Sequence, residues 1–411
     1  MSDLPKIWQI KKLRKIITTI ESSSRPKGGV RSIKEGIPSL GGEHLNNEGG
    51  FNLKNIRYVP EKFYSRLKKG KIKSGDILIV KDGATTGKTS FVNSSFPFKK
   101  ATVNEHIFII RSNNSEVLSK FLFHFLFSNS GQDQIKKTFH GSAQGGINTQ
   151  FVDFVNIPFP PILVQKRVIA KIDKLFEKID KAKSLRQKAL EETASIFPSA
   201  LHQIFSKAKE KGWAIKKLDE VCIINPSKRE LNNTPDNLEV SFIPMPAVDE
   251  VSGSIVSQKV KLLKEVKKGY TYFREGDVLF AKITPCMENG KSAIAKNLIN
   301  DIGFGSTEFH VLRPHKEILP EWIYFFIRQP SFRKEAKRDF IGTAGQQRVP
   351  KEFLERAEIP FPLLPEQRQI VAYLDTLRKK VEKLQRLQQE AQKEIDDLKK
   401  SILNKAFKGE L

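Results

Sequence analysis

Apolar residues recur at three- and four-residue steps through the last fifty residues of the chain, and no Pro or Gly interrupts the run from Glu366 to Lys400. This spacing is that of a heptad seam and predicts one long helix. The seam comprises Leu374, Leu377, Val381, Leu384, Ala391, Ile395, Leu398 and Ile402. A helix with one apolar stripe exposes Leu and Ile to water unless another element covers them, so the pattern also predicts a partner.

A second copy of this construction lies 202 positions earlier, because the hinge sequence Ile-Pro-Phe-Pro occurs at Ile157–Pro160 and again at Ile359–Pro362 (360 − 158 = 202). The earlier seam comprises Ile172, Leu175, Ile179, Ala182, Ala189, Ile196 and Ala200. Both seams close on a Leu-x3-Phe step, Leu201 with Phe205 and Leu403 with Phe407. The chain is therefore a tandem duplication in which each half ends in a long helix.

Each predicted helix has about 42 residues and a length of roughly 60 Å at about 1.5 Å per residue, enough to act as a spacer. The apolar pattern lapses at the same place in both copies, at Arg186 and Gln388. Polar seam positions fix register and orientation, so we predict an antiparallel coiled coil with a pseudo-twofold axis near these residues. The alternatives are a parallel pair and two helices that each pack on their own domain.

Strand-like and helix-like segments precede each hinge in the same order. Gly75–Lys81 and Gly276–Lys282 are turns followed by apolar runs, which predict buried strands. A further strand ends at Arg111 or Arg313, and one helix is then expected from Glu116 to about Lys137 and from Glu317 to about Lys337. The fold class is thus α+β, with two tandem domains of mixed α and β structure that each precede a long helix. The predicted divisions are residues 1–156, 157–208 (hinge and first helix), 209–358 and 359–411 (hinge and second helix).

The net charge of the chain limits the class of molecule that we expect it to bind. The chain has 71 Lys and Arg against 46 Asp and Glu in 411 residues, and its net charge of +25 favours a polyanion, of which nucleic acid is the commonest. A merely basic surface or an anionic membrane are the alternatives. Two Cys residues argue against a disulfide framework, and the first residues lack the pattern of a signal peptide, so we expect a cytoplasmic protein.

Candidate catalytic motifs fail on spacing. Gly83–Thr89 resembles a phosphate-binding loop but has three residues between its glycines where the pattern requires four. The seven His residues show no zinc spacing with Cys, and no Asn-Pro-Pro-aromatic tetrapeptide of amino-methyltransferases occurs. We therefore predict no catalytic residue, no metal site and no cofactor bound by this chain.

What remains is binding chemistry on corresponding loops of the two copies. Lys81 and Lys88 bracket one loop, and Lys282 and Lys291 bracket its counterpart, which suits contacts to DNA phosphates. The other candidate DNA-binding residues on these loops and on the loops before the hinges are Thr85, Thr86, Ser142, Gln144, Thr284, Asn289, Thr343, Gln346, Gln347 and Arg348. Asn and Gln match adenine edges and Arg matches guanine. For each residue the alternative is a solvated loop side chain.

The Gly-Asp-Ile-Leu strand at Gly75, the Gly-Ser-Ala loop at Gly141 and above all the sequence from Ile359 to Ile370 resemble the specificity subunit of type I restriction-modification systems. The resemblance extends over both halves. It implies two target-recognition domains that read an asymmetric, bipartite double-stranded DNA site, and a subunit that is itself non-catalytic. It also implies two methyltransferase subunits, which carry S-adenosylmethionine, and restriction subunits with motor and nuclease activity as partners.

By the same resemblance, the hinges dock the partner subunits. The residues concerned are Pro158, Phe159, Pro160, Gln165, Pro360, Phe361, Pro362, Glu366 and Gln367. The first hinge departs from the family pattern, because Leu163-Val164-Gln165 stands where Pro365-Glu366-Gln367 stands in the second. Two other functions stay open: a nucleotide-dependent DNA-processing enzyme, and a stand-alone DNA-binding coiled-coil protein without methyltransferase partners.

Overall fold

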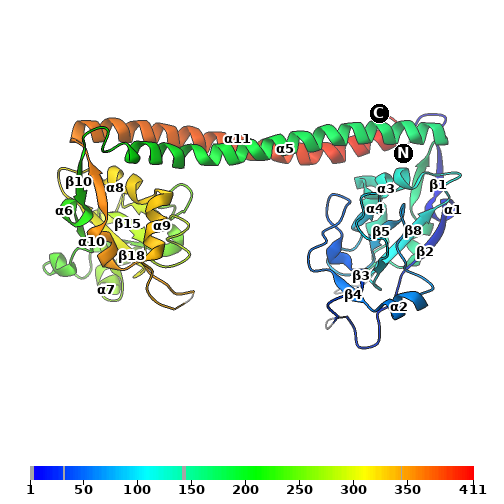
Figure 1. The fold of residues 1–411 in the computed structure, drawn as a ribbon, viewed down its shortest axis with the longest axis horizontal. Coiled ribbons are helices and arrows are strands. Elements are labelled where there is room, and N and C mark those ends of the chain that lie inside the picture. Colours follow the sequence, from blue (N-terminus) through cyan, green and yellow to red (C-terminus); the bar gives the residue numbers. More distant parts are fainter. Residues whose placement is uncertain (1–3, 31–32, 141–144, 344) are drawn as a thin grey trace. The chain divides into compact units, whose positions relative to one another are not determined.

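The computed structural model describes residues 4–30, 33–140, 145–343 and 345–411. The chain forms two compact units, and each contains parts of both long helices (Figure 1). Unit 1 comprises Met1–Leu185 with Ala391–Leu411, and unit 2 comprises Arg186–Glu390. The predicted boundaries at 156, 208 and 358 divide the chain by sequence, whereas compactness groups each domain with segments of two helices.

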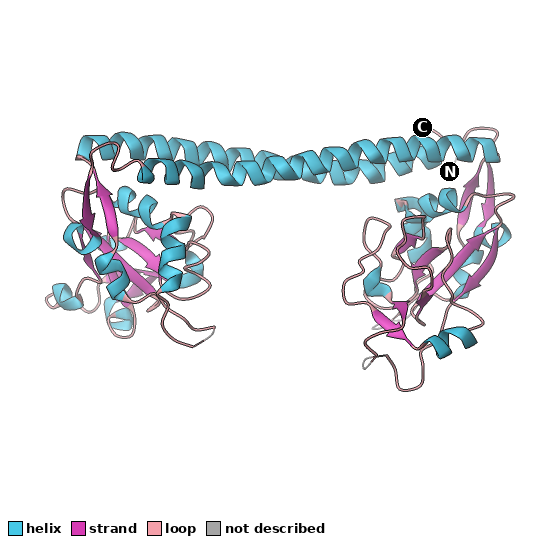
Figure 2. Ribbon diagram, in the orientation of Figure 1, coloured by secondary structure: helices cyan, strands magenta, loops and turns pink. Residues whose placement is uncertain are grey.

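Unit 1 alternates short strands and short helices before its long helical segments (Figure 2). Its elements are β1 (Gln9–Lys12), α1 (Leu13–Ile16), β2 (Ile17–Glu21), β3 (Ile37–Leu40), η1 (Gly42–His44), β4 (Arg57–Val59), α2 (Glu61–Arg66), β5 (Ile77–Val80), β6 (Thr89–Phe91), β7 (Thr102–Val103), β8 (Ile107–Ser112), α3 (Ser119–Phe127), α4 (Asn129–Lys136), η2 (Thr149–Asp153) and β9 (Asn156–Phe159).

The strands of unit 1 form a four-stranded sheet in the order β2-β8-β5-β6, a three-stranded sheet in the order β4-β3-β7, and a β1-β9 ribbon. Strand β5 is fully buried and serves both faces of the larger sheet, as the two-residue period of a strand requires. Ile77 and Ile79 face the core under α3 and α4, while Leu78 and Val80 face the core shared with the smaller sheet. This layering positions the loop that follows β5.

Unit 2 repeats the arrangement. Its elements are β10 (Ala214–Lys217), α6 (Leu218–Val221), β11 (Cys222–Ile224), η3 (Lys228–Leu231), β12 (Glu239–Ile243), η4 (Met245–Ala247), β13 (Lys259–Leu262), α7 (Leu263–Val266), β14 (Thr271–Arg274), β15 (Val278–Ala281), β16 (Ser292–Ile294), η5 (Ile299–Asp301), β17 (Ile302–Gly305), β18 (Phe309–Pro314), α8 (Pro320–Ile327), α9 (Pro330–Arg338), α10 (Lys351–Arg356) and β19 (Glu358–Phe361). Its sheets run β11-β18-β15-β16 and β13-β12-β17-β14, with a β10-β19 ribbon.

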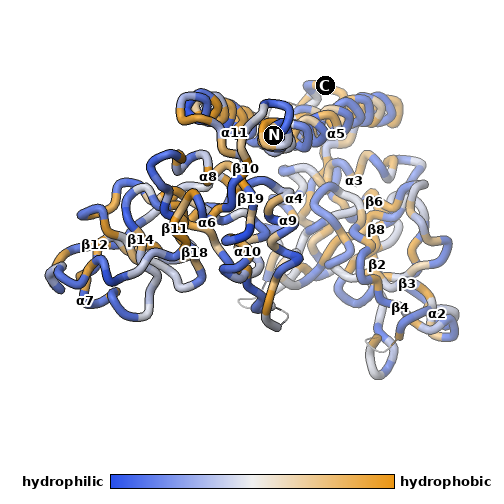
Figure 3. Tube along the Cα trace, turned by 60° about the vertical axis from the view of Figure 1, so that its left-hand side comes forward, coloured by the Kyte–Doolittle hydropathy of each residue, from blue (hydrophilic) through white to orange (hydrophobic). Residues whose placement is uncertain are grey.

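Two helices of 45 residues each, α5 (Ile162–Ser206) and α11 (Leu364–Lys408), follow the hinges. The hinge prolines lie in the ribbons, where Pro158 pairs with Ile10 and Pro360 with Ile215, so each helix begins only after the ribbon ends. Hydrophobic and hydrophilic stretches alternate along both helices (Figure 3), as expected for helices with one apolar face.

The two helices are antiparallel, because in each unit the early part of one helix pairs with the late part of the other. In unit 1, Lys399 of α11 forms an ion pair with Asp180 of α5 at 2.6 Å. In unit 2, Gln388 of α11 donates to the Thr193 hydroxyl of α5 at 3.1 Å. The predicted fold class is confirmed, and Gln388, a polar position of the seam, makes a hydrogen bond between the helices.

Each helix ends inside the core of a domain that the other half of the sequence supplies. In unit 1, Phe407 of α11 meets Phe121 and Phe125 of α3, with ring centroids 5.2 Å apart in both pairs. In unit 2, Phe205 of α5 lies with its ring centroid 4.8 Å from that of Trp322 in α8. Phe407 is 5% exposed and Phe205 6%, so the Leu-x3-Phe steps complete the two cores.

The predicted seam is only partly buried. Ile172, Ile179, Leu374 and Val381 are buried, and Leu175, Leu377 and Ile395 are half-buried. Ile196, Leu384 and Leu398 are 40%, 41% and 48% exposed. Burial is greatest toward the helix ends because the domains cover the helices there, where buried residues of both helices join the domain cores.

The expectation of one helix between strand and loop was wrong in both copies. In unit 1 the chain leaves helical geometry at Ser128, whose side chain caps α4 by accepting from the amide of Gly131. In unit 2 the break falls at Gln329, since Pro330 cannot donate the amide that a continuous helix needs. The Ser128 cap and Pro330 thus each divide into two helices a segment for which the apolar pattern predicts one helix.

No helix of the described chain is long and apolar enough to cross a membrane. The long helices fail this test because charged residues line the faces opposite their seams.

Gln165 and Gln367 tie each hinge to its domain. Gln367 is 0% exposed and accepts from the amide of Leu319 at 2.9 Å, while its amide group donates to the carbonyls of Glu317 and Pro362. Gln165 makes the corresponding three bonds, to Leu118, Glu116 and Pro160. The start of each long helix is therefore fixed to the start of its domain's own helix.

We expect Gln367→Ala to lower the free energy of unfolding of unit 2 by roughly 2–4 kcal/mol, because it leaves a buried amide and two carbonyls without partners. Gln165→Ala should have the same effect on unit 1. Urea unfolding of the full chain measures both. Gln389→Ala, at an exposed position of α11, is the matched control and should change little; equal effects of Gln367→Ala and Gln389→Ala would contradict this role.

Candidate nucleic-acid interface

The two loops predicted to bind DNA in each copy are joined by main-chain hydrogen bonds. In unit 1, the amide of Ile147 donates to the carbonyl of Lys81 at 2.7 Å, and Asp82 pairs with Gly146 as a β-bridge. In unit 2, Val349 donates to Lys282 at 2.9 Å and Thr284 donates to the carbonyl of Gln347 at 3.0 Å. Segments 66 positions apart in unit 1 (147 − 81) and 67 apart in unit 2 (349 − 282) thus form one surface in each unit.

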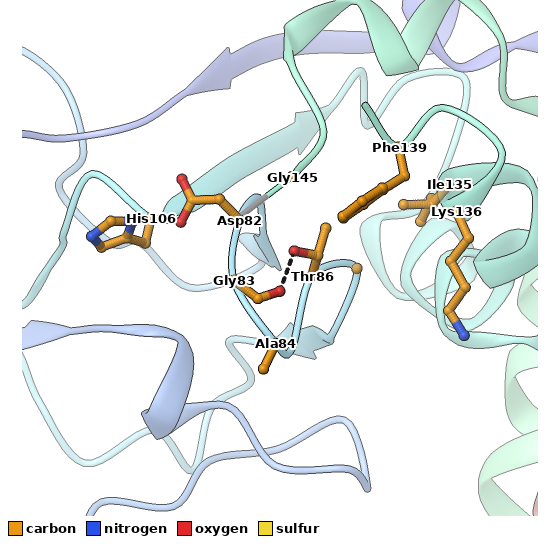
Figure 4. A pocket seen from close by; sticks show the side chains of 10 residues that line it. Asp82, Gly83, Ala84, Thr86, His106, Ile135, Lys136, Phe139 and Gly145 are labelled. Atoms are coloured by element: carbon orange, nitrogen blue, oxygen red, sulfur yellow. Dashed lines mark hydrogen bonds and ion pairs between the residues drawn. The ribbon is translucent and has the colours of Figure 1, made fainter. Parts of the chain in front are cut away.

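A hollow of about 950 Å³ opens beside the first loop of unit 1 (Figure 4). Asp82, Gly83 and Thr86 of the loop line one side, and Lys136 at the end of α4 and Phe139 after it line the other. Thr86 is held within its own loop, because its hydroxyl donates to the carbonyl of Gly83 at 2.7 Å. Ser142 and Gln144 lie outside the described residues.

A second hollow of about 830 Å³ shares this loop and is strongly basic. Its lysines are Lys88, Lys136, Lys183, Lys399 and Lys400, and its acidic residues are Glu48 and Asp133. Thr85 and Thr86 lie on its rim with Lys88. Five ammonium groups around one loop suit contacts to a phosphate backbone. The long helices therefore contribute to this surface, which the sequence reasoning missed because it treated them only as spacers.

The corresponding loop of unit 2 is held by carboxylates. The hydroxyl of Thr284 donates to Glu288, which also forms an ion pair with Lys337, and the hydrogen bond from Lys337 lowers the pKa of Glu288. Asn289 donates to Glu250 at 3.2 Å, and the ammonium of Lys291 lies 3.5 Å from the carbonyl of Met245. Thr343 and Gln346 are exposed on the pre-hinge loop.

Three structurally equivalent positions around these loops carry different chemistry in the two units. Unit 1 has Asp82 and His106, whose carboxylate oxygen and Nδ1 are 2.5 Å apart, and its third position is Gly146. Unit 2 has Ile283, Glu308 and Arg348 at the same places, since Lys81 and Lys282 bond to the carbonyls of His106 and Glu308 alike. The surfaces share a scaffold and differ in the groups they present.

Glu308 and Arg348 form a parallel fork, with Nε and Nη2 of Arg348 each 2.9 Å from one carboxylate oxygen of Glu308. The hydrogen bond from Arg348 holds the pKa of Glu308 below its usual value. Glu308 and His106 were not selected from the sequence, although each immediately precedes a strand, β18 in unit 2 and β8 in unit 1. Glu308 and His106 could be identified by comparing the two copies position by position, because the two residues occupy equivalent positions and differ in chemistry.

The hinge residues are largely internal. Pro158, Pro160, Pro360 and Pro362 are buried, and the rings of Phe159 and Phe361 lie under Lys11 and Lys216 at 4.0 and 4.1 Å. Glu366 accepts from the indole of Trp213 at 2.9 Å. Contact of these residues with partner subunits stays a prediction, and for Gln165 and Gln367 the hydrogen bonds described above give a role within the fold.

No group of three or more His, Cys, Asp or Glu that could hold a metal ion occurs in the described ranges. His310 is buried between Asn225 and the carbonyl of Val349, and burial lowers its pKa. Its ring therefore connects strand β18 to the pre-hinge loop.

Comparison of the sequence and the structure with known proteins identifies similarity to one family. A model described as the type I restriction modification DNA specificity domain matches residues 5–192 and again residues 210–393. The specificity subunit of the type I restriction enzyme EcoAI from Escherichia coli is 42% identical over 161 residues, which cover 39% of this chain and 27% of that protein. The chain thus matches only about a quarter of that relative's length.

Other similarities extend over nearly the whole chain. The EcoKI specificity subunit from Escherichia coli strain K12 is 25% identical over 435 residues, covering 99% of this chain and 90% of that protein. A solved chain from a study of complex assembly and conformational transition of the type I R-M system superimposes with a TM-score of 0.74 at 22% identity and covers 99% of both chains. The duplicated architecture is therefore found in a known structure.

We expect duplex DNA that carries the recognised sequence to slow alkylation of Cys286 several-fold, because this half-buried thiol lies on the loop between Lys282 and Lys291. Mass spectrometry of iodoacetamide-treated full chain measures the rate. Cys222 is the internal control, since it is 1% exposed and burial raises the pKa of its thiol to about 12. Equal rates for Cys286 with and without DNA would place this loop outside the interface.

Proposed function

Because the chain belongs to the family of the type I restriction modification DNA specificity domain, we propose that it selects the DNA site of a type I restriction-modification complex by reading a double-stranded sequence in two unlike halves. Unit 1 reads one half-site and unit 2 reads the other. The chain itself catalyses no reaction, and the methylation and cleavage chemistry belongs to its partners.

The observation that carries this proposal is the duplicated pair of loops with unequal chemistry. Both units present a loop after a buried strand, joined to a pre-hinge loop by an equivalent main-chain bond, from Ile147 to Lys81 in unit 1 and from Val349 to Lys282 in unit 2. At equivalent places they offer Asp82, His106 and Gly146 in one unit and Ile283, Glu308 and Arg348 in the other. Equal scaffolds with unequal side chains suit two half-sites of different sequence.

Affinity comes from charge and specificity from the loops. The net charge of +25 and the five lysines around the loop of unit 1 supply phosphate contacts, which position a duplex without reading it. Thr, Asn, Gln and Arg side chains on the loops supply base contacts, and each good bidentate pair is worth roughly 1–3 kcal/mol of discrimination.

Helices α5 and α11 set the spacing between the half-sites in this proposal. Insertion of residues into one helix of the pair would change the preferred gap. The two hinges dock two methyltransferase subunits, which hold S-adenosylmethionine and methylate adenine, and restriction subunits join this assembly. Exposed Leu163 and Leu363, 69% and 79% accessible, flank the buried hinge residues and support a protein contact at both places.

We expect the chain to direct adenine methylation to a split, asymmetric sequence. Genomic DNA is mapped for methylated adenine in cells that express the candidate methyltransferase subunit with and without this chain. A bipartite motif should be methylated only when the chain is present, and a foreign segment grafted over residues 1–156 should change one half of it. A graft that changes both halves would contradict the assignment of one half-site to each unit.

A second specificity subunit that activates the same methyltransferase is the control for that experiment. If the methyltransferase is active with that subunit and this chain directs no methylation, the chain is a stand-alone DNA-binding protein. That outcome would overturn its role as a specificity subunit and leave its DNA contacts intact.

We expect Lys88→Ala and Lys136→Ala each to weaken DNA binding about fivefold at ~0.15 M salt and to reduce the slope of log K against log salt by about one, because each removes one phosphate contact. The loss should be similar on specific and unrelated duplexes. Titration of the full chain by fluorescence anisotropy measures both quantities. Lys68→Ala, at an exposed position that lines neither hollow, is the matched control; an effect as large as that of Lys88→Ala would argue for general charge alone.

A further inference from the structure

The fork between Glu308 and Arg348 fixes the plane of one guanidinium at the edge of the unit 2 loops. Nε and Nη2 of Arg348 bond to Glu308, and Nη1 donates to the carbonyl of Gln346 at 2.8 Å. These bonds hold the long side chain from two sides, from the residue that precedes strand β18 and from its own loop. The rotamer freedom that an arginine normally loses on binding is therefore lost before any ligand arrives.

The N–H donors of Arg348 that these bonds leave free match the acceptors of one base. A guanidinium has five N–H groups, and three of them bond to Glu308 and Gln346, counting partners among the described residues only. One N–H is left on each terminal nitrogen. Two such donors on one planar group match O6 and N7 of guanine in the major groove, the commonest specific contact of arginine with DNA.

The pair is not a requirement of the shared fold. Unit 1 has the equivalent strand and the equivalent β-bridges, but His106 and Gly146 stand where unit 2 has Glu308 and Arg348. A side chain on Gly146 would meet the carbonyl of Lys81 at 2.3 Å, so unit 1 has no room for an arginine there. Both partners of the fork are partly exposed, with 24% and 38% of the Glu308 and Arg348 side chains accessible.

We propose that Glu308 is a positioning residue that presents Arg348 to a guanine in the half-site read by unit 2, an inference that rests on the proposed function. Glu308 accepts through both oxygens and leaves the outer edge of the guanidinium toward the DNA. An acidic residue at a DNA surface repels phosphate, and here it instead supplies orientation. Unit 1, which has His106 and Gly146 at these two positions, selects a different base there.

The test uses the full chain assembled with its methyltransferase subunit and a randomised pool of duplexes from which bound sequences are selected. The preference for guanine over each other base is measured at every position of the two half-sites. Arg348→Ala should lower that preference roughly 5- to 150-fold at one position of the unit 2 half-site. Glu308→Gln should lower it at the same position by a smaller factor, and the unit 1 half-site should not change.

Two further variants separate positioning from folding. Glu355→Gln removes a comparably exposed ion pair, to Lys351 on α10 of the same unit, and should leave every base preference intact. The exchange Glu308→Arg with Arg348→Glu restores an ion pair between the two positions, so it should keep the unfolding midpoint while the guanine preference is lost. Recovery of the guanine preference in this exchanged variant would overturn the proposal.

The remaining outcomes are distinct. A selective wild-type complex whose base preferences survive Arg348→Ala would show that Arg348 reads no base and would overturn this inference alone. Loss with Arg348→Ala but none with Glu308→Gln or Glu308→Ala would remove the positioning role of Glu308. A wild-type complex without sequence preference would overturn the proposed function together with this inference.

Discussion

The burial of one aromatic side chain at the far end of each long helix is the contact on which both units depend. Phe407 closes the core beneath α3, and Phe205 closes the core beneath α8, although each belongs to a helix that starts in the other unit. An aromatic ring removes roughly 150–250 Å² from water and adds edge-to-face contacts, so few single residues could contribute more to such a core. The sheets that carry the loops proposed to bind DNA rest on these same cores, so the geometry of the loops depends on the pairing of the helices.

The two units show how a duplicated scaffold holds loops that present different side chains. A partly buried ion pair joins Asp76 to Arg111 in unit 1 at 2.7 Å and Asp277 to Arg313 in unit 2 at 2.8 Å, at the same corner of the larger sheet. These pairs fix the strands from which the loops project. The loops themselves are restrained by local bonds, such as Thr86 to Gly83 in one unit and Thr284 to Glu288 in the other, and can differ without disturbing the sheets. The structural restraints are therefore common to both copies, whereas the loop side chains, to which we assign recognition, differ between them.

The sequence predicted the parts of the fold that repeat. The buried strands at Ile77 and Val278, the long helices and their antiparallel order all follow from patterns that occur twice. It failed where one local residue overrides periodicity, as Ser128 and Pro330 do when they divide a continuous apolar segment into two helices. From the sequence, loop residues can be chosen only by residue type. Residue type does not reveal that Arg348 is bonded to Glu308, or that Lys399 of α11 lines a basic hollow beside the loop of unit 1. Neither segment of such a pair has a sequence pattern that identifies the distant segment it contacts.

The exchange of helix ends also sets an order of events during synthesis. Residues 391–411 leave the ribosome after all of unit 2. The first domain therefore emerges with its aromatic face uncovered, and the face stays uncovered until Phe407 is made, 286 positions beyond Phe121 (407 − 121). Unit 2 has every one of its segments once Glu390 is made and can close earlier. Contacts this distant in sequence form slowly, and an unclosed apolar surface invites misassociation and chaperone binding. A nonsense mutation between the codons of Glu390 and Phe407 would therefore damage the domain encoded first.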